Sequence, residues 1–278
     1  ILEGKDAEFV QGILSIRDHN GNSVAHGLAQ KNGAVLRDML AGKDPRFVQG
    51  ILSISDPNGF SVAHQLTYDN GAALREILTG KSNEFVRDVL SIADHKGVSV
   101  AHWRAHRNGE ALRELLADKD PGFVRGILSI TDHNGKRIAH WLAQDNVETV
   151  KEILAGKDDG FVREILSIAD RDGDSVAYWL ANNYKGENAV ALRDILTGKS
   201  DEFANGILSI TNSNGNSVAH WLARNNGDAL RDILTGKSDE FVNGILLIEE
   251  QFGRSVAHWL GEHNFAALKE ILAVKDAE

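Results

Sequence analysis

The chain repeats itself with a fixed period, and this period restricts the possible folds more than any other feature. The motif Ser-Val-Ala-His recurs at a spacing of 38 residues, apart from one spacing of 42. Its seven copies, two of them varied, occupy residues 23–26, 61–64, 99–102, 137–140, 175–178, 217–220 and 255–258. A period of this length indicates a solenoid, in which each repeat buries its apolar face against its neighbours. We therefore expect residues 1–278 to form one array of seven stacked repeats.

The longer spacing indicates an insertion, and the two ends of the chain indicate how the array begins and ends. The four extra residues fall within 182–188, between two helical segments, where a loop can lengthen at little cost. The chain begins at Ile1 in the middle of a repeat, so we expect it to be an excerpt from a longer protein. Neither end carries a polar capping repeat, and this predicts head-to-tail self-association at high concentration.

Each repeat contains three segments with helical signals. The first begins at the motif, with Ser23 at its N-cap after a D-x-x-G turn, and the second covers residues 34–40, with Gly42 as its left-handed C-cap. The third begins each time at an N-cap residue, and Pro45 and Pro121 occupy first helical positions. These N-cap residues are Asp6, Asp44, Ser82, Asp120, Asp158, Ser200 and Ser238. The fold class predicted is all-α, an α-solenoid of about three short helices per repeat with negligible strand.

The run from Asp132 to Ala143, followed by Val150 and the pair Ile153-Leu154, resembles the ankyrin consensus. That consensus has a D-x-x-G-x-T turn, a proline-leucine-histidine step, an alanine-rich first helix and a second helix ending in paired leucines. The resemblance covers a little over half of each repeat. It implies a protein–protein interaction scaffold whose binding surface lies on the turns and the ends of the first helices.

The rest of each repeat departs from the ankyrin pattern. Ankyrin repeats are shorter than 38 residues and carry a β-hairpin arm where this sequence has the well-capped third segment. Both an ankyrin-like array with helical arms and a distinct three-helix solenoid fit the sequence. A weaker resemblance, carried by Arg224 to Leu230, is to the repeats of transcription-activator-like effectors, and it implies a nucleic-acid-binding helical array as the alternative function.

The composition argues against several classes of function. A net charge of -10 disfavours nucleic acid as the partner, and no apolar run is long enough to span a membrane. The absence of cysteine excludes disulfides and thiolate metal sites, and it favours the cytoplasm or the interior of a host cell as the location. No phosphate-binding loop, nucleophile elbow or paired-carboxylate motif is present, so we expect no enzyme activity and no cofactor.

Histidine, tryptophan and basic residues each recur at one position of the repeat. The motif histidines lie roughly 8–10 Å apart in stacked helices, too far to share a metal, and we interpret them as capping-box partners of the motif serines. His102 and His106 share a helix face, but further metal ligands are missing. The tryptophans can pack between repeats, which we favour, or form an exposed row for stacked bases or a peptide; they are Trp103, Trp141, Trp179, Trp221 and Trp259.

Two basic columns are the features that could bind phosphate. We expect the lysines to contact helix C-terminal carbonyls and nearby acids; they are Lys5, Lys43, Lys81, Lys119, Lys157, Lys199, Lys237 and Lys275. In the second column an acidic residue follows each basic one, so the two signs largely cancel. Its members are Arg37, Arg75, Arg113, Lys151, Arg193, Arg231 and Lys269.

Comparison of the seven repeats locates the candidate partner-binding surface. Framework positions hardly change, whereas the two residues inside each D-x-x-G turn and the one after it vary. These positions are His19, Asn20, Asn22, Pro57, Asn58, Phe60, His95, Lys96, Val98, His133, Asn134, Lys136, Arg171, Asp172, Asp174, Ser213, Asn214, Asn216, Gln251, Phe252 and Arg254. The ends of the first helices vary too, as at Tyr68-Asp69 and His106-Arg107. Exposed turns can also vary without binding anything, but Phe60 and Phe252 are large apolar groups in polar turns and favour a protein partner.

Overall fold

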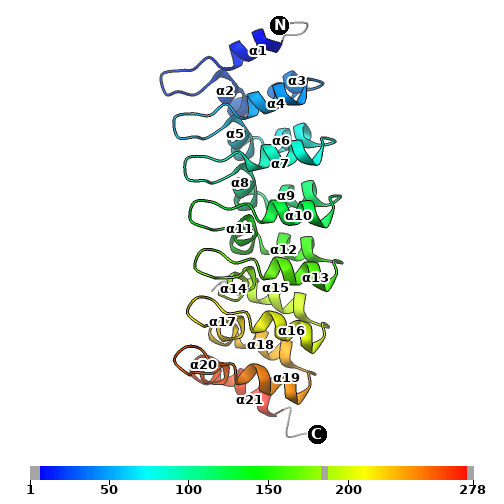
Figure 1. Ribbon diagram of the computed structural model, residues 1–278, viewed down its shortest axis with the longest axis vertical. Helices are drawn as coiled ribbons and strands as arrows, with labels where there is room; N and C mark the ends of the chain where they lie inside the picture. Colours follow the sequence, from blue (N-terminus) through cyan, green and yellow to red (C-terminus); the bar gives the residue numbers. More distant parts are fainter. Residues whose placement is uncertain (1–6, 183–186, 274–278) are drawn as a thin grey trace. The chain divides into compact units, whose positions relative to one another are not determined.

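The computed structural model describes residues 7–182 and 187–273, and every regular element in this part of the chain is an α-helix. The residues divide into two compact units, Ile1–Ile138 and Ala139–Glu278, each of which is considered by itself. In both units a repeat contributes three short helices and one protruding loop (Figure 1). The prediction of an all-α solenoid is confirmed. One continuous array over 1–278 stays a prediction.

Repeats are numbered one to seven by their motif. The first helices are α2 (Val24–Lys31), α5 (Val62–Asp69), α8 (Val100–Arg107), α11 (Ile138–Asp145), α14 (Val176–Asn182), α17 (Val218–Asn225) and α20 (Val256–His263). The second helices are α3 (Gly33–Leu40), α6 (Gly71–Leu78), α9 (Gly109–Leu116), α12 (Val147–Leu154), α15 (Glu187–Leu196), α18 (Gly227–Leu234) and α21 (Phe265–Ala273). The third helices are α1 (Ala7–Leu14), α4 (Pro45–Leu52), α7 (Asn83–Ser91), α10 (Pro121–Leu128), α13 (Asp159–Leu166), α16 (Asp201–Leu208) and α19 (Asp239–Leu246).

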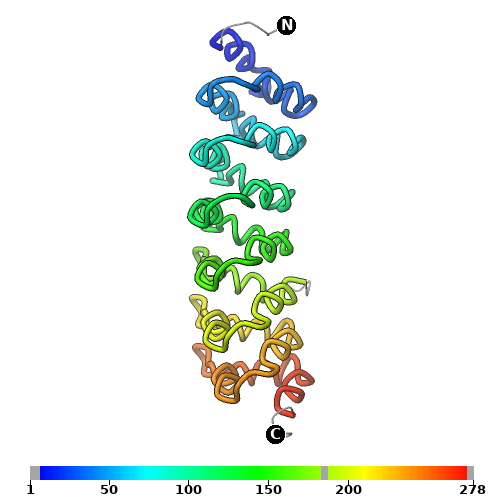
Figure 2. The backbone as a smooth tube through the Cα atoms, turned by 90° about the vertical axis from the view of Figure 1, so that its right-hand side faces the viewer, coloured from blue at the N-terminus to red at the C-terminus, as the bar shows by residue number. Residues whose placement is uncertain are grey.

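Within each unit, a helix packs on the helix of the same kind in the next repeat. In the first unit α2, α5 and α8 form one row and α3, α6 and α9 another, and in the second unit α14, α17 and α20 form the corresponding row (Figure 2). The core runs between the rows. Ala63, Leu74 and Val86, one from each helix of a repeat, are almost fully buried. A repeat is therefore completed by its neighbours, as the period predicts.

The third helices begin where their N-cap residues predict. The Asp44 carboxylate accepts the backbone N–H of Arg46 at 2.8 Å, and Pro45 takes the first helical position. Ser82 and Asp120 accept the N–H of the phenylalanine three residues on, at 3.2 and 2.9 Å. The same bond forms at Asp158, Ser200 and Ser238, whereas Asp6 lies outside the described residues. Gly42 has the predicted left-handed backbone, with a φ of +68°.

The sequence did not predict the conformation of the segment that links each third helix to the next motif. This segment, which we call the finger, is a narrow hairpin with the D-x-x-G turn at its tip. In the finger of repeat two, Val62 N–H donates to Ile54 at 2.9 Å and Asp56 N–H donates to Phe60 at 2.9 Å. Besides these hydrogen bonds, the pairing of the two sides amounts to one isolated bridge, between Ser55 and Ser61, and no strand forms in this finger. Each repeat thus has both a helical third segment and a hairpin, where the sequence had suggested that the helix replaces the hairpin arm.

Neighbouring fingers approach so closely that a side chain is excluded at the turn glycine. Gly97 has a φ of +72°, and a Cβ atom there would lie 2.4 Å from the Cδ2 of His133 and 2.7 Å from its backbone nitrogen. Glycine therefore meets two requirements at this position, the left-handed conformation and the contact with the next finger.

At five junctions a buried histidine joins a finger to the preceding repeat. In repeat one the Nδ1 atom of His26 accepts the Ser23 backbone N–H at 3.2 Å and lies 2.8 Å from the Ser23 hydroxyl. Because Nδ1 accepts, the proton of the neutral ring is on Nε2, which donates to the carbonyl of Phe60 at 2.9 Å. The predicted capping box is confirmed at this site. Its extension into the next repeat was not foreseen.

The same bridge recurs in both units. His64 donates to Val98 at 3.0 Å, His140 to Asp174 at 3.2 Å and His220 to Arg254 at 3.1 Å. Repeat five has Tyr178 instead, and there the Ser175 hydroxyl still accepts the Tyr178 N–H at 3.0 Å. The helix cap therefore tolerates replacement of the histidine by tyrosine.

The bridging histidines predict that stability falls in weak acid. Burial lowers the pKa of His64 and His220, and it lowers that of His102 from 6.5 to about 4. Below pH 6.5 these histidines are protonated in the unfolded chain but stay neutral in the folded chain. The free energy of unfolding therefore declines as pH falls from 6.5 towards the folded pKa. By pH 5, His102 alone should account for a loss of about 2 kcal/mol. Urea unfolding between pH 7.5 and 5 measures this loss.

A glutamine substitution provides the control for this prediction. His102→Gln keeps a capping-box residue that does not titrate, and it should make the decline with pH shallower. His19→Gln, in an exposed turn, should leave the decline unchanged. A free energy of unfolding that stays constant from pH 7.5 to 5 would contradict the assignment of the neutral tautomer.

Candidate binding surface

The two residues inside each D-x-x-G turn are exposed in all seven repeats. The residue after the glycine is half-buried in repeats one to six and exposed only at Arg254. The structure thus divides the candidate positions into two classes. Fourteen lie at the finger tips, and they are His19, Asn20, Pro57, Asn58, His95, Lys96, His133, Asn134, Arg171, Asp172, Ser213, Asn214, Gln251 and Phe252. The other seven lie one step further along the finger, where the backbone carbonyl is available to the histidine bridge.

The backbone of each tip is held by the first residue of the turn. The Asp94 carboxylate accepts the N–H of Lys96 at 2.8 Å and that of Val98 at 2.9 Å. Asn212 does the same in repeat six, and Glu250 in repeat seven. Because these bonds use only backbone groups of the tip residues, the side chains at the tip can change while the backbone keeps its conformation.

Backbone hydrogen bonds also join neighbouring tips. His95 N–H donates to the carbonyl of Asn58 at 3.2 Å, and His133 N–H donates to that of Lys96 at 3.1 Å. In the second unit Ser213 N–H donates to Asp172 at 3.4 Å. Pro57 has no N–H, so the finger of repeat two cannot form this bond to repeat one. The tips within a unit therefore present their side chains from a shared, hydrogen-bonded backbone.

The two phenylalanines of the candidate surface lie in different environments. Phe60 is half-buried, with its ring 5.0 Å from that of His64 and 5.6 Å from that of Trp103. Phe252 is 80% exposed at the tip of repeat seven. Phe60 therefore packs within the stack, and Phe252 is the apolar side chain that remains available to a partner.

The tryptophans pack against aromatic and basic side chains of adjacent repeats. Trp221 lies 5.1 Å from Tyr178 and 5.8 Å from Trp259, in edge-to-face arrangements, and Arg224 lies over both tryptophan rings. In the first unit Trp103 contacts Phe60 and Tyr68 in the same way. Trp259 is almost fully buried and Trp103 and Trp221 are half-buried, as expected for rings that fill the space between repeats.

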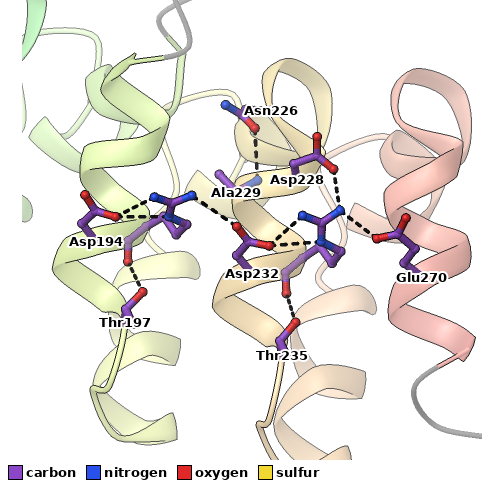
Figure 3. A network of polar contacts seen from close by, with 10 residues as sticks. Asp194, Thr197, Asn226, Asp228, Ala229, Asp232, Thr235 and Glu270 are labelled. Atoms are coloured by element: carbon purple, nitrogen blue, oxygen red, sulfur yellow. Dashed lines mark hydrogen bonds and ion pairs between the residues drawn. The ribbon is translucent and has the colours of Figure 1, made fainter.

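The basic column of the second helices forms ion pairs from one repeat to the next. Arg37 pairs with Glu76, Arg75 with Glu114 at 2.6 Å, and Lys151 with Asp194 at 3.0 Å. In the second unit Arg193 pairs with Asp194 and Asp232, and Arg231 with Asp232 and Glu270 (Figure 3). The predicted cancellation of charge is confirmed for these residues, and its form is a row of ion pairs that links the helices.

Two members of the lysine column contact the preceding repeat. Lys199 binds Asp159 at 2.6 Å and Lys237 binds Asp201 at 3.2 Å, each carboxylate lying at the start of a third helix. Lys237 also donates to the carbonyl of Lys199, which lies beyond the end of α15 and is not the helix C-terminal carbonyl that was expected. The neighbouring acid Asp44 instead caps α4. Lys5 and Lys275 lie outside the described residues.

One buried residue differs from the residue that the other repeats carry at its position, and the sequence analysis did not identify it. The first helices carry leucine at positions 28, 66, 142, 180, 222 and 260, whereas repeat three has Arg104. Its side chain is 1% exposed, and no carboxylate is paired with it among the described contacts. The departure from leucine in a repeated column was the signal that could have identified it.

In residues 7–182 and 187–273, no three or more acidic or histidine side chains are grouped as metal ligands would be. His102 uses both ring nitrogens, since Nδ1 contacts Ser99 and Nε2 donates to Lys136 at 3.4 Å. Within these same ranges, no helix has the length and apolar character needed to cross a bilayer.

Known structures resemble the chain although known sequences do not. No protein-family model matches it, and neither does any curated protein. The ankyrin repeat domain of Bcl-3, described as a unique member of the IkappaB protein family, superposes with a TM-score of 0.59 at 18% identity. The match covers 92% of this chain and 100% of that one. The chain therefore has an ankyrin-repeat-like fold.

Two further solved structures give lower scores. The ankyrin repeat protein EF0377 matches with a TM-score of 0.48 at 16% identity. A chain from the structure of the predatory endopeptidase Bd0816 from Bdellovibrio bacteriovorus in complex with the immunity protein Bd3460 matches with a TM-score of 0.45 at 15% identity. Each match covers 73% of this chain and 92% of the other chain.

The two environments of phenylalanine generate a prediction about stability. Phe60→Ala removes a ring that packs on His64 and Trp103, and it should lower the free energy of unfolding by about 1–3 kcal/mol. Phe252→Ala removes an exposed ring and should change it by less than about 0.5 kcal/mol. Urea unfolding of both variants measures the difference. Equal losses would contradict the distinction between the two residues.

Proposed function

We propose that this ankyrin-repeat-like protein is a non-catalytic scaffold that binds a protein partner with the tips of its fingers. The observation that carries the proposal is the combination of exposed, varied side chains with a hydrogen-bonded tip backbone. A surface of this kind can change its specificity without loss of the fold, and its rigidity reduces the entropy lost on binding.

Two features of the tips support a protein as the partner. They offer mixed chemistry, with Asn58 and Asn134 as hydrogen-bonding groups, Lys96 as a cation and Phe252 as an apolar anchor. Single side chains project at a regular spacing from consecutive repeats. Such a surface can contact several points on an extended protein face, with an aromatic group as the strongest contact.

The alternative, a nucleic-acid-binding helical array, has less support. The second-helix cations are engaged with carboxylates, and Lys199 and Lys237 contact acidic residues of the preceding repeat. Phosphate binding would require these ion pairs to break, and the net charge of -10 opposes it. A mobility-shift assay at low salt separates the two functions, since only the alternative expects salt-sensitive retardation of DNA or RNA.

The tips can be tested with a partner captured by the full chain. The triple variant Asn58→Ala, Lys96→Ala and Asn134→Ala removes three exposed tip side chains of the first unit. It should weaken binding at least tenfold, ~1.4 kcal/mol, without lowering the melting temperature. Phe252→Ala applies the same test to the second unit. Isothermal titration calorimetry and thermal unfolding supply the two measurements.

A matched variant on another face provides the control. Arg46→Ala with Glu84→Ala changes exposed residues of the third helices α4 and α7, and it should leave the affinity unchanged. If all tip variants bind as tightly as the original chain, the variation of the turns reflects only a lack of constraint. A loss of affinity in the third-helix variant alone would move the site to that face.

A further inference from the structure

Arg104 is a buried cation without a paired anion. Its guanidinium makes two long hydrogen bonds, from Nη1 to the Gly71 carbonyl at 3.4 Å and from Nη2 to the Ala111 carbonyl at 3.3 Å. Its Nε atom is buried and has no acceptor among the described residues. Burial lowers the pKa of Arg104 to about 10, so the group remains charged at neutral pH.

Two acidic groups near Arg104 are already engaged. Glu114 binds Arg75 at 2.6 Å on the second helices. The Asp69 carboxylate accepts the side-chain amide of Gln65. A buried charge that lacks a partner is strongly unfavourable, and leucine fills this position in the other six repeats. The arginine is therefore a costly departure from the framework, and a ligand could supply the missing negative charge.

A recess of about 330 Å³ adjoins the guanidinium, between repeats two and three. Its lining includes Arg104, Arg107 and Asn108 from repeat three, and Tyr68, Gly71 and Ala72 from repeat two. The Arg107 guanidinium lies 4.3 Å from the centre of the Tyr68 ring, which places a second cation at the recess. Two arginines thus approach one small space from the same repeat.

The start of α6 also contributes to this recess. Asn70, at its N-cap position, accepts no side-chain cap hydrogen bond, and its amide nitrogen donates to the carbonyls of Ala29 at 2.6 Å and Gln30 at 3.1 Å. In the part of the chain that the structure describes, no acceptor is found for the backbone N–H groups of Gly71 and Ala72. Free N–H groups at a helix start attract anions, and here they line the same space as the buried arginine.

We propose that this recess binds a small oxyanion, a carboxylate or phosphate group, with Arg104 as its buried counter-charge. Arg107 and the start of α6 surround the same group. Asp69 also lines the recess and opposes a large negative charge, so the site suits a single small anionic group. The proposal does not rest on the binding of a protein partner, because a free anion is sufficient to fill the site.

The experiment uses the full chain and three simple salts. Thermal unfolding is followed in sodium phosphate, sodium acetate and sodium chloride at matched ionic strength. Phosphate, acetate or both should raise the melting temperature in a saturable way, beyond the effect of chloride. Phosphate alone identifies a phosphate site, and acetate alone a carboxylate site. Nuclear magnetic resonance titration should shift the backbone N–H signals of Gly71 and Ala72.

Substitutions separate this site from a general salt effect. Arg104→Leu restores the residue of the other repeats, so it should raise the melting temperature without ligand and weaken anion binding at least tenfold. Asp69→Asn removes the opposing charge and should tighten binding about two- to tenfold. Arg46→Leu, which changes an exposed arginine on α4, should behave as the original chain.

The proposal is overturned if the original chain and Arg104→Leu respond equally to all three salts. It is also overturned if the Gly71 and Ala72 signals stay unchanged at saturating anion. Should Arg104→Leu fail to fold, Arg104→Lys keeps the charge but loses the planar pair of donors. Weaker binding in that variant, together with tighter binding in Asp69→Asn, supports the site, and unchanged binding in both refutes it.

Discussion

The hydrogen bond from a buried histidine to the carbonyl of the next finger is the interaction on which the rest of the structure depends. One imidazole completes the N-cap of its own helix through Nδ1 and fixes the neighbouring finger through Nε2. The same side chain therefore stabilises both the start of its own helix and the stacking of the next repeat. Since the two bonds require the neutral ring with its proton on Nε2, each repeat that carries this bridge depends on one protonation state.

The candidate surface follows from this attachment. The carbonyl used by the histidine belongs to the residue after the turn glycine, which explains why that residue is half-buried while the two before it are exposed. The ion pairs of the second helices join neighbouring repeats elsewhere in the repeat. Backbone contacts and paired charges thus maintain the stack, and the tip residues remain exposed.

Features set by neighbouring residues could be predicted from the sequence, and features set by stacking could not. The caps at Asp44 and Ser82 depend on contacts within three residues, so the pattern of residue types reveals them. The partner of His26 lies 34 residues away and is a backbone carbonyl, which has no sequence signature. Phe60 looked like an exposed anchor because its turn is polar, but the next repeat supplies Trp103 to cover it. The recess at Arg104 likewise exists only where two repeats meet.

The contacts between repeats also bear on how such a chain can change in length. The ion pair Arg37–Glu76 spans 39 residues, whereas Lys151–Asp194 spans 43, because four extra residues lie between its members. In both cases the ion pair joins the second helices of two consecutive repeats. The contact is therefore specified by repeat order and tolerates a change in the intervening length. Duplication or deletion of one whole period would place equivalent donors and acceptors opposite each other again. A gene of this kind can therefore gain or lose whole repeats by unequal recombination while ion pairs between the second helices form again.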